Sequence, residues 1–112
     1  MTADKFRSLA LELPDTVEGA HNGHPDFRVA GKIFASLGPK EAWGMIKLSP
    51  DDQAALIRAA AGAFEIFNGE WGRRGATKVC LEDAKVAVVR KALVAAWRQL
   101  APKRVIEYFD EN

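Results

Sequence analysis

Five basic side chains beside two turns of the chain could bind phosphate groups. They are Arg28, Lys32, Arg73, Arg74 and Lys78. Arginine and lysine contact the DNA backbone independently of base sequence, and glycine in a neighbouring loop lets the backbone approach closely. A simpler interpretation is that these are solvated surface charges, some of them paired with Asp26 or Glu70, because arginine and lysine are usually exposed. The sequence alone leaves both interpretations open.

Two histidines and a carboxylate, His21, His24 and Asp26, raise the question of metal binding or catalysis. A metal site needs more ligands than this segment supplies, and an Asn22-Gly23 turn explains why the histidines are close together. Histidine also acts as an acid or base near neutral pH, but no serine, cysteine or paired carboxylate joins these two in a recognisable motif. We therefore expect no metal and no enzymatic activity, and an enzyme using His21 or His24 is the weakest alternative.

The segment 68–75 contains three glycines and is expected to form a loop. It lacks the GxxxxGK[ST] arrangement that cradles phosphates, so we expect no nucleotide or other cofactor. Trp71 in this segment could stack on a base or a ligand, although loop tryptophans more often fold back on the core. Cys80 is expected to be a small buried hydrophobic residue at the end of a strand.

The hydrophobic pattern predicts the elements that position these residues. A helical stripe predicts an amphipathic helix over residues 2–13, and alternating residues within 24–37 predict a β-hairpin that turns at Ala30-Gly31. The second hairpin strand is expected to place Ile33, Ala35 and Leu37 on one side and Lys32, Phe34 and Ser36 on the other. The next strand is expected to place Trp43, Met45 and Lys47 opposite Gly44, Ile46 and Leu48.

The hydrophobic pattern of the remaining residues predicts further helices and strands, which together indicate an α+β fold. These are a strand over 42–48, a helix over 49–61, strands over 64–67 and 77–81 that pair, a helix over 83–100, and a last turn over 105–109. The order is α-β-β-β-α-β-β-α, to which a short strand over 17–21 can be added. We expect a two-layer sandwich in which an antiparallel sheet carries helices on one face.

Length and composition bound the class of protein. A chain of 112 residues predicts a single domain over 1–112. The isoelectric point near 7.9 lies below the value of about 9 that is typical of strong nucleic-acid binders, although residues 71–112 carry nine basic and five acidic side chains. The lone cysteine excludes an intramolecular disulfide, and no apolar run reaches the length of a signal peptide or membrane span. We expect a cytoplasmic monomer that does not bind membranes.

Three stretches resemble the MmcQ/YjbR family of small bacterial proteins, also called DUF419: residues 24–37, 48–50 and 71–79. The resemblance extends over nearly the whole chain. It implies a two-layer fold of the kind seen in type III secretion chaperones, and DNA binding through a double-wing arrangement of β-hairpins. The shared motifs are hairpin and glycine-loop sequences, which identify a fold better than a reaction.

Two functions are therefore predicted. The first is weak, salt-dependent binding of double-stranded DNA through two wings that carry the five basic residues. The alternative is a protein-interaction or small-ligand-binding module that uses the sheet face without nucleic acid. A contiguous apolar patch around Trp43, Phe34 or Trp71 would favour the alternative, and a continuous positive potential across the hairpins would favour DNA.

Overall fold

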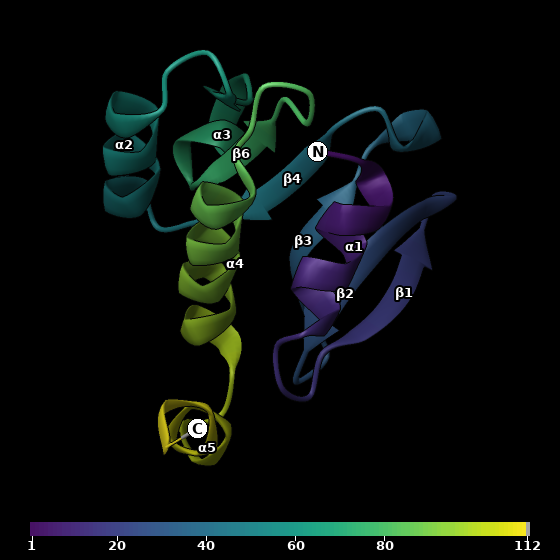
Figure 1. Cartoon of the computed structure of the whole chain (residues 1–112), viewed down its shortest axis with the longest axis vertical. Helices are drawn as coiled ribbons and strands as arrows, with labels where there is room; N and C mark the ends of the chain where they lie inside the picture. The colour runs from purple at the N-terminus through teal and green to yellow at the C-terminus, as the bar shows by residue number, and fades with distance from the viewer. Residues whose placement is uncertain (112) are drawn as a thin grey trace.

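The computed structural model describes residues 1–111, in which six strands and five α-helices form one α+β unit (Figure 1). The first half contains, in order, α1 (Ala3–Leu11), β1 (Val17–His21), β2 (His24–Val29), β3 (Lys32–Leu37), the short 3-10 turn η1 (Pro39–Glu41) and β4 (Gly44–Lys47). Thr2 caps the start of helix α1, because its hydroxyl accepts a hydrogen bond from the backbone N–H of Lys5 at 3.0 Å. The strand over 17–21 is present.

The second half contains α2 (Pro50–Ala59), β5 (Phe64–Ile66), α3 (Gly69–Arg73), β6 (Ala76–Val79), α4 (Val86–Leu100) and α5 (Lys103–Glu111). Ser49 caps α2 as predicted, because its hydroxyl accepts a hydrogen bond from the Asp52 N–H at 3.1 Å. None of the helices within residues 1–111 combines the length and apolarity needed to cross a bilayer.

The six strands form one antiparallel sheet in the order β1-β2-β3-β4-β6-β5. The predicted hairpin between β2 and β3 and the predicted pairing of β5 with β6 are both confirmed. Strand β6 lies beside β4, so the β5–β6 pair extends the first four strands rather than forming a separate sheet.

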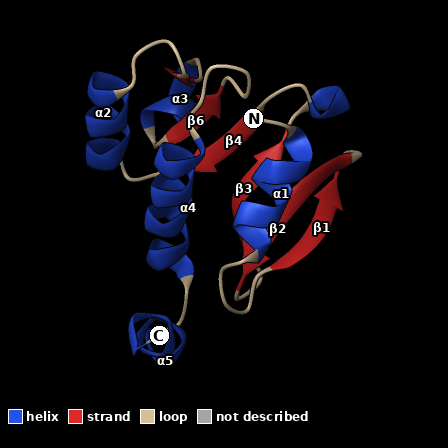
Figure 2. Cartoon of the chain, viewed as in Figure 1, coloured by secondary structure: helices blue, strands red, loops and turns tan. Residues whose placement is uncertain are grey.

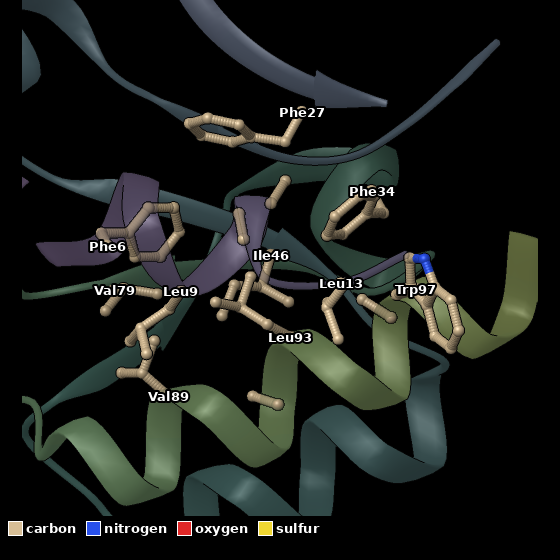
Figure 3. Close-up of a cluster of buried hydrophobic side chains, with 14 of the residues drawn as sticks. Phe6, Leu9, Leu13, Phe27, Phe34, Ile46, Val79, Val89, Leu93 and Trp97 are labelled. Carbon is tan, nitrogen blue, oxygen red and sulfur yellow. The ribbon is translucent and has the colours of Figure 1, made fainter. Parts of the chain in front are cut away.

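Helices α1 and α4 lie across one face of the sheet, which confirms the two-layer architecture (Figures 1 and 2). Their apolar faces meet the sheet in the core, where Phe6 of α1, Phe27 of β2 and Trp97 of α4 are fully buried (Figure 3). The opposite face carries Asp26, Ser36 and other side chains that point away from these two helices. We call it the open face.

The prediction that side chains alternate strictly between the two sides of β3 is wrong. The pairing of β2 with β3 shifts register between Phe27 and Arg28, so Phe34 is an extra residue on β3, as in a β-bulge. Phe34 and its neighbour Ala35 are consequently both fully buried in the core. Ile33 is turned to the open face instead.

The expectation of a loop over 68–75 is also wrong, because α3 forms within it. A Cβ on Gly72 would overlap the carbonyl oxygen of Phe67, so glycine allows this helical turn to pack against the end of β5. The helix predicted to start at residue 83 begins at Val86. The segment 105–109, predicted as a single last turn, belongs to the longer helix α5.

Candidate binding site on the open sheet face

A buried carboxylate organises one end of the open face. Asp26 of β2 is 0% exposed. Its Oδ1 accepts a hydrogen bond from Arg28 Nε at 2.8 Å, and its Oδ2 accepts one from Arg28 Nη2 at 3.0 Å. His21 Nδ1 lies 2.8 Å from the same Oδ2. Gly19 pairs with Asp26 across the strands, and a Cβ there would press on the Asp26–Arg28 pair.

These contacts determine the ionisation of Asp26 and the orientation of His21. The Arg28 hydrogen bonds lower the pKa of Asp26, and they outweigh burial, which acts in the opposite direction. An ionised carboxylate only accepts hydrogen bonds, so Nδ1 of His21 carries the proton that it donates. Nε2 is then the His21 ring nitrogen available to another group.

Asp26→Asn should lower the free energy of unfolding by about 2 kcal/mol near pH 7, because an amide cannot replace the charge-assisted hydrogen bonds. The folded-state pKa lies below the ordinary 3.8, so the ionised carboxylate stabilises the fold above that value. This contribution is lost as the pH falls through the folded-state pKa.

Urea unfolding of both proteins at about pH 7 and about pH 3 measures this effect. The difference between wild type and variant should shrink in acid. Asp4→Asn is the control, because the Asp4 side chain is 90% exposed in its ion pair with Arg7. A difference between wild type and Asp26→Asn that is the same at both pH values would contradict the assignment.

Three aromatic rings form a wall at the other end of the open face. The Phe67 ring lies between two tryptophans, with its centroid 5.4 Å from Trp43 and 4.7 Å from Trp71. Lys78 Nζ lies 5.6 Å from the Trp43 centroid, a cation–π distance. A Cβ on Gly38 would overlap the indole of Trp43, so glycine lets this ring lie against the chain. The wall is therefore held in place from several sides.

A pocket of about 410 Å³ lies between the histidines and this wall, and we call it the open-face pocket. Its lining consists of His21, His24, Ile33, Ser36, Leu37, Gly38, Pro39, Trp43, Met45, Lys47 and Trp71. Most of this surface is apolar, and none of these residues is acidic. The pocket can therefore hold a flat apolar group and offer it a few polar contacts at the edge.

The five predicted phosphate-binding residues are distributed over several places. Arg28 is held by buried Asp26, and Lys32 is exposed at the start of β3. Arg73 and Arg74 are exposed at the C-terminal end of α3, where each lies 3.4 Å from a carboxylate oxygen of Glu70. The predicted pairing of some of these charges with Asp26 and Glu70 is confirmed.

The remaining residue of the five, Lys78, lies on β6 over Trp43. Strand β4 separates the β2–β3 hairpin from β6 and α3 in the sheet (Figure 1). Cys80 follows β6 and is partly buried, and burial raises the pKa of its thiol. The described residues bring together no metal-binding group of three or more histidine, cysteine or acidic side chains.

The sequence pattern predicted some residues of the pocket and not others. Trp43, Met45 and Lys47 do share one side of the chain, as the alternation predicted. Ser36 and Phe67 were not recognised as residues of this site. Their signals were weak: Ser36 is a single small polar residue of β3, and Phe67 is a single aromatic residue that follows a short strand.

An antiparallel sheet with helices on one face and a pocket on the other defines a small α+β domain of the open-faced type. The model of the YjbR family matches residues 11–99, and the chain therefore belongs to the YjbR family.

A crystal structure of the Deinococcus radiodurans protein DR2400, which contains a DUF419 domain, is similar to this chain with a TM-score of 0.73. The similarity covers 92% of this chain and 80% of that chain at 17% sequence identity, so it concerns the fold alone. No curated protein matches the sequence.

Proposed function

We propose that this protein is a binding module that takes a small, flat organic ligand in the open-face pocket. One observation carries the proposal: a pocket of about 410 Å³ on the face of the sheet opposite α1 and α4 is walled by two tryptophans and edged by two histidines. Ligand pockets are typically about 300–1,000 Å³, mostly apolar, with a few polar groups that orient the ligand.

The contacts within the pocket support binding rather than a reaction. Trp71 is 49% exposed and Met45 of the pocket lining is buried, which gives a ligand an exposed ring beside an apolar floor. His21 is hydrogen-bonded to Asp26, but among residues 1–111 the hydroxyl of Ser36 makes no hydrogen bond to it. A serine nucleophile activated by histidine would need that contact. The proposed role is therefore non-enzymatic.

Binding can be tested with 2-naphthamide as a neutral flat probe, followed through the indole N–H signals of the three tryptophans. The signals of Trp43 and Trp71 should shift on titration. Trp97 is the internal control, because its indole N–H donates to the Pro14 carbonyl oxygen at 3.0 Å in the core. Shifts confined to Trp97 would contradict the proposal, as would the absence of shifts with this probe and with charged probes of the same shape.

Trp43→Ala should weaken binding of this probe about tenfold or more, because stacking on an aromatic side chain contributes about 1–3 kcal/mol per ring. The dissociation constant from the Trp71 indole shift measures the loss. Tyr108→Ala is the matched control, since Tyr108 is an aromatic residue of α5, 61% exposed, and is absent from the pocket lining. Equal losses in the two variants would contradict the role of Trp43.

A second candidate function is the binding of double-stranded DNA, and the exposed arginines of α3 favour it. The side chains of Arg73 and Arg74 are 73% and 75% exposed. Exposed ion pairs of this kind contribute little, so a phosphate can replace Glu70 as their partner. On the β2–β3 hairpin, Lys32 is exposed, whereas the Arg28 side chain is hydrogen-bonded to Asp26.

The Arg73→Ala/Arg74→Ala double variant tests this candidate by fluorescence anisotropy with a labelled duplex at about 50 mM and about 200 mM salt. If both arginines contact phosphates, the slope of log K against log salt should fall by about 2 in magnitude, with thermal stability nearly unchanged. The control is Lys103→Ala/Arg104→Ala, which removes two exposed charges from α5. An unchanged slope of log K against log salt in the Arg73→Ala/Arg74→Ala variant would contradict DNA binding through these wings.

A further inference from the structure

We infer that the ligand of the open-face pocket is a flat aromatic anion whose charge is bound by Lys47. The inference rests on the proposed function and specifies its ligand class. It starts from the charges around the pocket: the ionisable side chains of the lining are Lys47, His21 and His24, and none of the lining residues is acidic. An anion therefore meets only neutral or positive groups there.

The carboxylate of Asp26 does not reverse this balance. It is fully buried and already accepts hydrogen bonds from Arg28 and from His21. A cationic ligand would have to compete with the arginine for it, at the cost of a buried ion pair. The negative charge of Asp26 is thus used within the protein.

Lys47, by contrast, is available. Its side chain is exposed at the end of β4, and within residues 1–111 it forms no ion pair. Its ammonium group can therefore bind a ligand anion without first breaking an internal contact. A charge-assisted hydrogen bond at the edge of an apolar pocket is stronger than a neutral one.

The positions of the lining residues match a ligand that is apolar at one end and charged at the other. Trp43, Met45 and Lys47 follow one another at intervals of two residues and line the same pocket. An aromatic ring, an apolar side chain and a cation therefore lie in a row on one side of the chain. The distance from the first to the last is about 13 Å at about 3.3 Å per residue, which a two-ring aromatic acid and the flexible lysine can bridge together.

Ser36 offers a further polar contact at the floor of the pocket. It lies opposite Met45 in the sheet and is only 6% exposed. It lines the pocket and, unlike the Thr16 hydroxyl, its hydroxyl is not a buried unpartnered group among the described residues, so it is accessible to a ligand. A ligand carboxylate that reaches Lys47 can also accept a hydrogen bond from this group.

Three nearly isosteric probes separate charge from shape. They are 2-naphthoate, 2-naphthamide and 2-naphthamidine, which carry a negative charge, no charge and a positive charge. Affinities are measured from the indole shifts of Trp43 and Trp71 in the full chain. We expect 2-naphthoate to bind about tenfold more tightly than 2-naphthamide, and 2-naphthamidine to bind most weakly.

Variants of Lys47 test whether this side chain causes the preference for 2-naphthoate over 2-naphthamide. Lys47→Gln should bring the affinity for 2-naphthoate down to that for 2-naphthamide, whereas Lys47→Arg should keep the preference. Lys5→Gln is the control, because Lys5 is an exposed lysine on α1 that does not line the pocket. A preference that persists in a folded Lys47→Gln protein would overturn the role of Lys47.

The outcomes distinguish the two proposals. Equal affinities for all three probes, with the Trp43 signal shifting in each titration, would overturn the inference and leave the proposed binding function intact. Tighter binding of 2-naphthamidine would also overturn the inference alone. No shift with any probe would overturn both.

Discussion

Replacing Trp97 by alanine should remove about 4 kcal/mol of folding free energy, the largest loss expected for any side chain of the core. Trp97 is fully buried and joins three parts of the chain. It belongs to α4, its indole N–H donates to the Pro14 carbonyl oxygen before β1, and its ring lies 5.1 Å from Phe109 of α5. The variant loses both the packing and this hydrogen bond.

Urea unfolding followed by circular dichroism measures this loss. Small domains have about 5–15 kcal/mol of stability in total, so much of the reserve would be gone. Trp71→Ala is the matched control, because the same substitution at a ring that is 49% exposed should cost less than about 1.5 kcal/mol. Similar losses in the two variants would show that Trp97 does not hold these elements together.

Gly75→Ala is expected to have the second largest effect, a loss of about 3 kcal/mol or more. Gly75 lies between α3 and β6 with φ +116°, a conformation that side chains rarely adopt. A Cβ there would overlap the carbonyl oxygen of Leu48, and the Leu48 N–H donates to the Gly75 carbonyl oxygen at 3.0 Å. The substitution therefore separates the end of β4 from the start of β6.

Gly69→Ala separates backbone strain from overlap. Gly69 belongs to α3 and also has a positive φ, +80°, but a Cβ there would contact nothing within 4 Å. Its substitution should cost only about 1 kcal/mol. Thermal unfolding of the two variants gives the comparison, and a loss for Gly75→Ala no greater than that for Gly69→Ala would contradict the role of the Leu48 contact.

Local signals made several elements predictable from the sequence. The hydroxyls of Thr2 and Ser49 cap α1 and α2 because a side-chain oxygen satisfies a free N–H at a helix start. The Ala30-Gly31 turn, with both residues at positive φ, joins β2 to β3. The alternation along β4 also placed Trp43 and Lys47 on the same side.

Long-range pairing explains what the sequence did not predict. The bulge at Phe34 results from the register in which β2 pairs with β3, and the sequence of β3 alone does not predict it. The alternation of β2 showed that Asp26 faces away from Phe27. Its burial depends on Arg28 and His21, and His21 comes from a different strand.

The aromatic wall was hidden for the same reason. Trp71 and Phe67 come from α3 and the end of β5, and they meet Trp43 only because β6 lies beside β4 in the sheet. That strand order does not follow the order of the sequence. The five basic residues were visible as charges, but their distribution over the β2–β3 hairpin, β6 and α3 depends on the same topology.

The most direct test of the proposed site is a set of intermolecular nuclear Overhauser effects between the ring protons of bound 2-naphthoate and the protein. We expect contacts to the indole protons of Trp43 and Trp71 and to the methyl group of Met45, all three of which line the open-face pocket. Contacts only to side chains of α1 or α5, or a bound probe that makes none to Trp43 and Trp71, would contradict it.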